Sequence, residues 1–173
     1  MRGIMLVCLA CAALLPMTVA EAELTASDAP CGKEAWNRFV PDLVAAQSAF
    51  VRGDPASMKA LWSHAEDVTL MGAWGGRERG WALVGARLDW VSESNAGGKG
   101  MYSYDEVASI VGSDLALFVQ IEHIAIPNID RGATKHLRVT HVMRCEGASW
   151  RVVSRHADRL METTPPPGVK KQQ

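Results

Sequence analysis

The chain has 173 residues, of which 48% are hydrophobic and 21% charged, and its formal net charge is −1 with histidine counted as neutral. This length and composition indicate one globular domain that is long enough to bury a hydrophobic core. The near-neutral charge gives no indication of a nucleic-acid or polyanion partner, so we expect none.

The first 22 residues have the three parts of a secretory signal peptide. Arg2 supplies a positive charge, residues 4–15 form an apolar run, and residues 20–22 (AEA) form a small-x-small cleavage site. The alternative is a retained membrane anchor, but the run is shorter than the ~20 residues that span a bilayer. We expect a signal peptide over residues 1–22, a periplasmic or secreted mature chain, and no membrane attachment after cleavage.

Cleavage of this signal peptide would leave two cysteines in the mature chain, Cys31 and Cys145. No CxxC or zinc-type spacing is present, and in an oxidising compartment such a pair favours a disulfide. The bridge would stabilise the fold by roughly 4 kcal/mol in the chain-entropy model. Two buried, inert thiols are the alternative.

Helices are expected in the first half of the domain. Residues 23–32 are polar and turn-rich and indicate a linker. Apolar residues at helical spacing predict helices over 33–40 and 42–52, with Pro41 either kinking the first or opening the second. A short helix is expected to begin at Asp54-Pro55, and another to cover 81–91.

A short strand over residues 67–71 runs into a loop with Gly75, Gly76 and Gly80. This glycine spacing fits neither a dinucleotide-binding fingerprint nor a nucleotide phosphate loop. We therefore expect a sharp strand-to-helix connection there and no nucleotide cofactor.

Four long strands are expected after the last helix, over 101–111, 115–126 and on both sides of a hairpin turn at 146–149. Pairing Val111 with Leu115 places Asp105 and His123 on a common face. Pairing Cys145 with Trp150 places His141, His156 and Asp158 on one largely apolar face. Glu122 is then expected to pair with Arg138 and Arg155 on the outer face.

This order of elements predicts an α+β fold in which a curved antiparallel sheet wraps around the N-terminal helices. Such a cone leaves an open end that can hold a small molecule. The folded domain is expected to cover residues 33–160, and the polar, proline-rich tail over 161–173 is expected to be disordered.

Several segments together resemble the SnoaL-like and ketosteroid-isomerase-like proteins of the nuclear transport factor 2-like superfamily. They are residues 67–72 (DVTLMG) with the following glycines and Trp81, residues 137–140, and residues 150–158 (WRVVSRHAD). The resemblance implies the same cone-shaped fold. Because the superfamily includes isomerases, cyclases, dehydratases, hydrolases and non-catalytic domains, it leaves the activity open.

The chain departs from the ketosteroid isomerase pattern at two places. Gly72 stands at about the position of the catalytic aspartate base, and the first helices contain no tyrosine for an oxyanion hole. The isomerase mechanism of that family is therefore not expected in unchanged form.

The candidate catalytic residues are His156 and Asp158, with His141 on the neighbouring strand. A histidine needs only a small pKa shift to act as a general acid or base, and a nearby carboxylate can raise its pKa and orient it. The alternative is that these groups only hydrogen-bond to each other or to the backbone, which would satisfy polar atoms that burial otherwise penalises.

Two functions follow from this pattern. The first is an exported protein that binds a small apolar molecule, and the second is a cofactor-independent acid/base enzyme such as an isomerase, cyclase or dehydratase. The residues expected to contact a ligand are Trp62, Trp74, Trp81, His123 and Asp105. No metal is expected, because the sequence has no local ligand motif, and a homodimer is expected through the outer face of the sheet.

Overall fold

The computed structural model describes residues 31–97, 99–127, 132–161 and 167. The expected signal peptide over 1–22 lies outside these residues, as do most of the expected linker and most of the expected tail. Within the described part of the chain, no helix is long and apolar enough to span a membrane.

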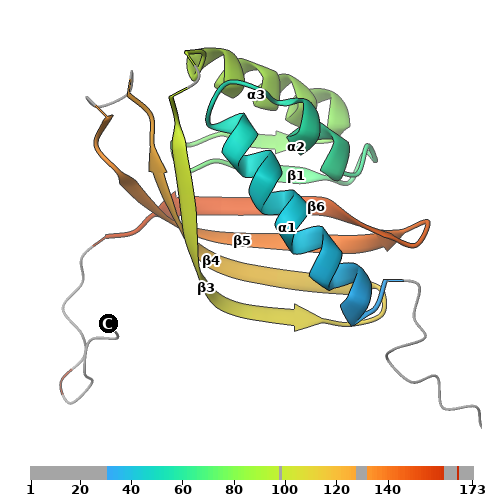
Figure 1. Ribbon diagram of the computed structural model, residues 1–173. Helices are drawn as coiled ribbons and strands as arrows, with labels where there is room; N and C mark the ends of the chain where they lie inside the picture. The colour runs from blue at the N-terminus through green and yellow to red at the C-terminus, as the bar shows by residue number, and fades with distance from the viewer. Residues whose placement is uncertain (1–30, 98, 128–131, 162–166, 168–173) are drawn as a thin grey trace, which may run out of the picture.

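The described residues form three helices and six strands in an α+β arrangement (Figure 1). The helices are α1 (Lys33–Phe50), α2 (Ala56–Leu61) and α3 (Trp81–Ser94), and the strands are β1 (Thr69–Met71), β2 (Arg77–Arg79), β3 (Met101–Val111), β4 (Leu115–Ala125), β5 (Lys135–Glu146) and β6 (Ser149–Arg159). The strands expected over 101–111 and 115–126 correspond to β3 and β4. The short strand β2 is an addition, because the glycine-rich segment that was expected to be only a connection folds back on β1 as a hairpin.

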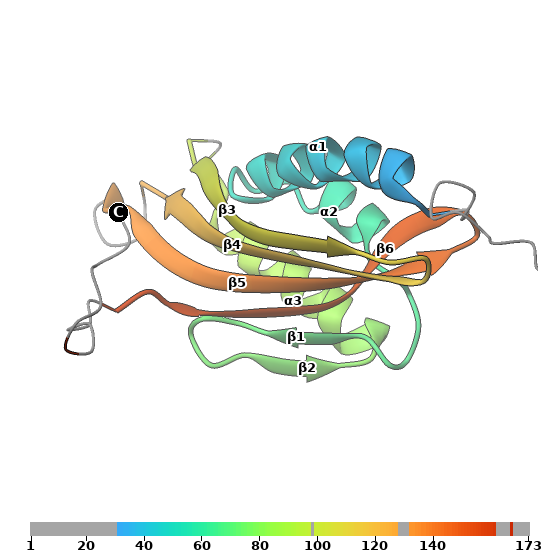
Figure 2. The same cartoon turned by 90° about the horizontal axis from the view of Figure 1, so that it is seen from below.

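The strands form one curved, unclosed sheet in the order β2-β1-β6-β5-β4-β3. Figure 2 shows α1 lying along the concave side of this sheet. All neighbouring strands are antiparallel except β1 and β6, which run parallel. The predicted α+β fold with a curved sheet is confirmed, but the sheet is mixed, because β1 enters it through a long crossover that includes α3 and the strands β3 to β5.

Helix α1 is continuous through Pro41, so of the two alternatives the one in which Pro41 opens a second helix is wrong. An internal proline removes one backbone hydrogen bond and costs a helix about 3 kcal/mol. The helix buries a stripe of residues that spans both sides of the proline: Trp36, Phe39, Leu43, Ala46 and Gln47. Burying each large apolar side chain contributes roughly 1.5–3 kcal/mol, which outweighs the cost of the proline.

The core lies between α1 and the sheet and contains several aromatic rings in edge contact. The Trp36 ring centroid lies 5.8 Å from that of Phe118 on β4 and 6.2 Å from that of Trp150 on β6, both nearly perpendicular. Edge-to-face pairs of this kind add to the stabilisation that burial supplies. The helix is thereby fixed to strands from both halves of the sheet.

The hairpin between β5 and β6 contains a β-bulge that changes its register. Cys145 pairs with Trp150 and Met143 with Val152, as predicted, but Val142 pairs with Ser154, so Val153 is an extra residue in β6. Beyond the bulge His141 therefore pairs with Arg155, where strict alternation predicted Ser154. Because side chains alternate with a period of two, one extra residue moves each following side chain of β6 to the opposite face.

The predicted disulfide is confirmed. Cys31, just before α1, is bonded to Cys145 near the end of β5, and the two residues are 114 positions apart in the chain. Both the first turn of α1 and the β5–β6 hairpin are thus held together by a covalent bond at the same end of the domain.

Replacing both cysteines by serine is expected to lower the free energy of unfolding by about 4–5 kcal/mol, because the open chain gains the entropy of an unclosed loop of this length. Urea denaturation of the double variant measures this loss. Reduced wild-type protein is the matched control and should lose a similar amount, whereas unchanged stability in both would contradict the proposed role of the bridge.

Candidate functional site

The bulge in β6 places His156 and Asp158 on the outer face of the sheet, so the prediction that they project into the hollow is wrong. His156 is exposed and pairs in register with Met71 of β1. Asp158 accepts two hydrogen bonds of 2.7 Å from Arg138, which lower the pKa of its carboxyl group. The acid/base enzyme that was expected to use this pair therefore loses its geometric basis.

The same bulge brings Arg155 to the inner face, where it meets a buried carboxylate. Arg155 Nη2 lies 2.6 Å from Glu122 Oε2, and the Glu122 side chain is completely buried. The expected ion pair between these residues exists, but it lies inside the fold, and the expectation that it lies on the outer face is wrong. Arg138 alone of the three is on the outer face.

Glu122 is held by donors from three elements of the fold. Its Oε1 atom accepts hydrogen bonds of 2.9 Å from Gln47 of α1 and from Gln120 of β4. Gln120 also lies 3.3 Å from the hydroxyl of Tyr102 on β3, and burial together with the Glu122 charge raises the pKa of that phenol, so it stays neutral. This inner cluster (Gln47, Tyr102, Gln120, Glu122 and Arg155) fixes the guanidinium group of Arg155.

A cavity of about 380 Å³ lies against this cluster, and both Gln47 and Arg155 contribute to its wall. The volume is within the range of small-molecule sites. Most of the remaining wall is apolar and comes from α1, α2, α3, β1, β4 and β5: Phe50, Val51, Met58, Trp62, Leu70, Leu88, Val91, Ile124 and Leu137. Its charged residues are arginines, Arg87 and Arg155, and each is paired with a glutamate.

Two exposed tryptophans, Trp74 and Trp90, also line the cavity, and each side chain is 59% exposed. The guanidinium of Arg159 lies 5.8 Å from the Trp74 ring and that of Arg87 lies 5.1 Å from the Trp90 ring, within the range of cation–π contacts. These pairs hold two broad apolar surfaces in place at the exposed part of the cavity wall.

The predicted ligand-contacting residues divide between the cavity and other places. Trp62 and Trp74 line the cavity, whereas Trp81 stacks on His64 with a ring separation of 3.8 Å. His123 and Asp105 contact each other on the outer face of the sheet. Trp90 was not among the predicted ligand-contacting residues; it lies three residues after Arg87 on α3, so the two side chains share one side of the helix.

His141 lies on the inner face as predicted, but it is completely buried and is not part of the cavity wall. Neither ring nitrogen has a hydrogen-bond partner among the described residues. Burial, together with the nearby charge of Arg155, lowers the pKa of His141 well below its ordinary value of 6.5. The ring is therefore neutral at physiological pH and is not placed to exchange a proton with a ligand.

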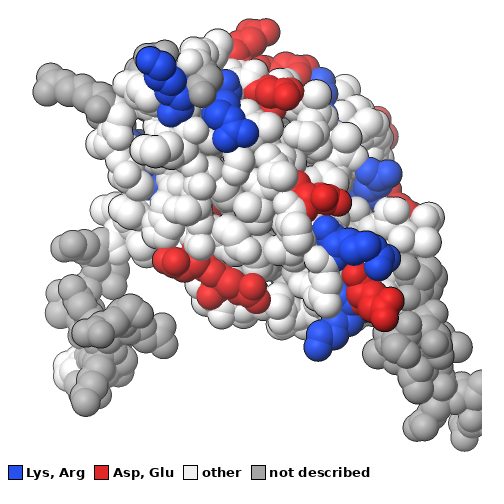
Figure 3. Space-filling view, viewed as in Figure 1, with Lys and Arg blue, Asp and Glu red and all other residues white. Residues whose placement is uncertain are grey.

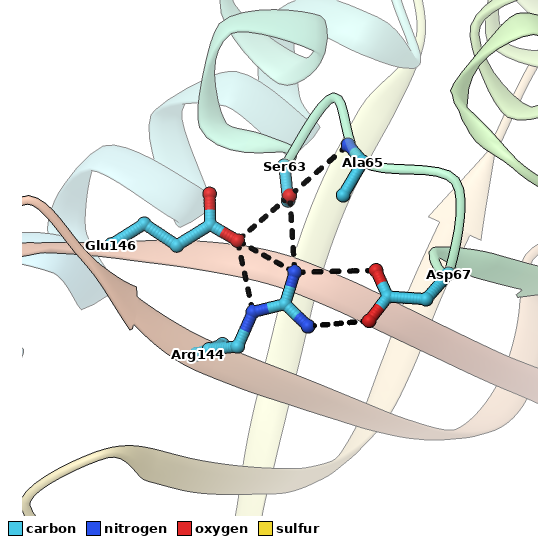
Figure 4. A network of polar contacts seen from close by, with 5 residues as sticks. All are labelled: Ser63, Ala65, Asp67, Arg144 and Glu146. Atoms are coloured by element: carbon cyan, nitrogen blue, oxygen red, sulfur yellow. Dashed lines mark hydrogen bonds and ion pairs between the residues drawn. The ribbon is translucent and has the colours of Figure 1, made fainter.

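A second polar network joins the segment after α2 to the β5–β6 hairpin (Figure 4). Arg144 donates to Asp67 at 2.6 Å and to Glu146 at 2.7 Å, and the Ser63 hydroxyl donates to Glu146 at 2.8 Å. The hydrogen bond from Arg144 lowers the pKa of Asp67. Burial raises the pKa of Glu146, but the hydrogen bonds from Arg144 and Ser63 outweigh this effect, so the pKa of Glu146 is lowered overall. Because Trp62 directly precedes Ser63, this network also positions one wall of the cavity.

Charged side chains are dispersed over the face of the molecule seen in Figure 3. Basic and acidic residues alternate there with uncharged ones, and neither sign covers this face continuously. A nucleic-acid site normally presents a continuous basic surface. The candidate binding site is therefore the apolar cavity.

A His141→Leu substitution is expected to raise the free energy of unfolding at neutral pH, because it removes two buried nitrogens without partners, each costing about 1–3 kcal/mol. In the unfolded chain His141 binds a proton below pH 6.5, whereas in the folded chain it does not. Wild-type stability should therefore fall by up to about 1.4 kcal/mol per pH unit below that value from this residue.

Urea denaturation at pH 7.5 and pH 5.5 measures both effects. The leucine variant should lose less stability on acidification than wild type, and His156→Leu, at an exposed position, is the matched control that should keep the wild-type difference. An unchanged pH dependence in the His141 variant would show that the buried imidazole is not the cause.

Comparison with known proteins places the chain in a family. Residues 43–159 match the family model of the SnoaL-like domain. No curated protein matches the sequence. Among solved structures, a protein from Thiobacillus denitrificans named as a calcium/calmodulin-dependent protein kinase type II association domain is 25% identical, with a TM-score of 0.59 over 69% of this chain and 93% of that chain.

Two further structures are similar in fold. A nuclear transport factor 2-like superfamily protein from Salmonella enterica is 18% identical, with a TM-score of 0.64 over 79% of this chain and 98% of its own. A domain with a cystatin-like fold from Nostoc punctiforme is 16% identical, with a TM-score of 0.58 over 75% of this chain and 78% of that chain. The chain belongs to the SnoaL-like domain family and has the nuclear transport factor 2-like fold.

Proposed function

We propose that the protein binds one small, largely apolar molecule in the cavity between the sheet, α1 and α3. The observation that supports this most directly is the composition of the wall, which is mostly aliphatic and aromatic, with Gln47 and Arg155 as its polar groups at the inner cluster. A site of this kind gains affinity from apolar burial and specificity from a few oriented polar groups.

The guanidinium of Arg155 supports a ligand that carries a hydrogen-bond acceptor. Among the described residues its side chain makes one hydrogen bond, from Nη2 to Glu122, so other N–H groups of the fork are available to a ligand at the cavity wall. Because Glu122 already balances the charge of Arg155, a neutral oxygen such as a carbonyl is the acceptor that fits without adding a second anion beside Glu122.

Fluorenone and fluorene are suitable probes, because they share size and shape and differ in one carbonyl oxygen. Titration followed by tryptophan fluorescence should show fluorenone binding about tenfold more tightly, which corresponds to one net hydrogen bond of about 1.4 kcal/mol. Substituting Val91, which lines the cavity, by tryptophan should fill the space and weaken both ligands.

Leu83→Trp is the matched control, since Leu83 lies on the same helix but is 60% exposed and outside the cavity wall. A Glu122→Gln, Arg155→Met variant, which removes the donor without leaving an unpaired buried charge, should lose the preference for fluorenone while still binding fluorene. Equal affinities of the Val91 and Leu83 variants would exclude this cavity as the binding site.

We also propose that two copies associate through the outer face of the sheet. A row of apolar side chains crosses three strands there, because Ile110 of β3 pairs with Leu117 of β4, which pairs with Val142 of β5. Ile110 is 65% exposed and Leu117 37%, and Val107 and Leu115 near them are exposed as well. A second copy would cover this row with an equivalent one.

Light scattering after size exclusion should give twice the chain mass for wild type and the mass of one chain for an Ile110→Lys, Leu117→Lys variant. Leu83→Lys places a new charge on an exposed leucine of α3 and should leave the mass unchanged. A wild-type chain that elutes as a monomer at all concentrations would rule out this association.

A further inference from the structure

Two histidines and an aspartate meet on the outer face of the sheet, away from the cavity. His123 of β4 and His136 of β5 are direct cross-strand partners, and their Nδ1 atoms lie 2.6 Å apart. Asp105 of β3 lies 2.9 Å from the Nε2 atom of His123. All three are carried by adjacent strands, so the sheet backbone fixes their spacing, and we call this group the His123–His136 site.

Asp105 decides which nitrogen of His123 is free to bind a ligand. An ionised carboxylate only accepts hydrogen bonds, so the Nε2 atom of His123 carries the hydrogen that it donates. In the neutral ring the lone pair is then on Nδ1, the atom that faces His136. A carboxylate that fixes a histidine tautomer in this way is the usual outer partner of a metal-binding histidine.

The separation of the two Nδ1 atoms suits a particular coordination geometry. With metal–nitrogen bonds of about 2.0–2.1 Å, two nitrogens at 90° lie about 2.9 Å apart, and at the tetrahedral angle about 3.3 Å. The observed Nδ1–Nδ1 distance of 2.6 Å must increase by only a few tenths of an ångström to reach the 90° arrangement. The tetrahedral arrangement needs about twice that increase. Square-planar geometry is typical of copper(II) and nickel(II), whereas zinc prefers the tetrahedral one.

The charges around this site do not oppose a cation. Arg138 is the neighbouring positive group on the same face of β5, and its guanidinium is paired with Asp158 through two hydrogen bonds. Asp105 adds a negative charge, and its side chain is 75% exposed. The ring planes of the two histidines are inclined by 75° to each other.

We propose that His123 and His136 together bind one copper(II) ion through their Nδ1 atoms, with Asp105 as the positioning residue. On binding, His136 carries its hydrogen on Nε2, so both rings stay neutral and no bond is broken. Among the described residues no three His, Cys, Asp or Glu side chains form a metal-binding group. Water would therefore fill the other positions, and the affinity depends on both histidines.

Copper(II) titration of the untagged protein, followed by calorimetry and by electron paramagnetic resonance, tests the proposal. One equivalent should bind, with nitrogen hyperfine structure from two imidazoles, and affinity should follow the order copper, nickel, zinc. His123→Ala and His136→Ala should each weaken this binding at least tenfold, and Asp105→Asn should weaken it by roughly 10- to 100-fold.

His156→Ala is the matched control, because His156 is an exposed histidine on the same face of the sheet but outside the site. It should keep the wild-type affinity and spectrum. Thermal unfolding without metal should be similar for all variants, since the three side chains lie at the surface. Copper binding that survives in both the His123 and His136 variants, or a wild-type protein that binds no copper, would overturn the proposal.

Discussion

The single extra residue in β6 determines what this fold places inside it. With Val153 inserted, the remainder of the strand places Arg155 and Ala157 on the inner face of the sheet and leaves His156 and Asp158 on the outer face. Without the insertion, the outer and inner sets would be exchanged, and His156 would lie on the inner face in place of Arg155. The identity of the charged group at the cavity wall thus depends on a local irregularity of the backbone.

Burying Glu122 and Arg155 has a cost as well as a use. Removing both charges from water is expensive, and their attraction compensates only when further hydrogen bonds complete the arrangement. Gln47 and Gln120 supply these bonds, one from the helix and one from the sheet. The cluster therefore couples the position of α1 to the sheet, and it orients a guanidinium that an apolar pair could not provide.

Much of the fold was predictable because it follows from residue patterns of short period. The bounds of β3 and β4, the pairing of Cys145 with Trp150 and the disulfide to Cys31 were all accessible from the sequence. Even the expected grouping of Asp105 with His123 is correct. In the β3–β4 hairpin, Val111 pairs with Ala116 and not with Leu115 as predicted, which shifts the register by one residue. A bulge after Glu106 reverses this shift, so Asp105 and His123 still lie on the same face.

The candidate site was less predictable, because bulges and tertiary packing have no reliable sequence signal. Strict alternation assigned the wrong face to His156 and Asp158, and the continuation of α1 through Pro41 depends on packing that the local sequence does not contain. Trp90 lines the cavity because of where α3 packs in the folded domain, whereas its spacing from Arg87 indicates only that the two share a side of the helix.

The disulfide and the Arg144 network both act at the hairpin end of β5, whereas Leu137, at the start of the same strand, lines the cavity. Eight residues of extended strand separate Leu137 from Cys145, a distance of about 26 Å. Helix α1 has the same polarity, with its first turn beside the bridge and Gln47 and Phe50 at the cavity. The disulfide thus lies at one end of both α1 and β5 and the cavity at the other, so local opening around the cavity would leave the covalent bond and the elements it joins in place.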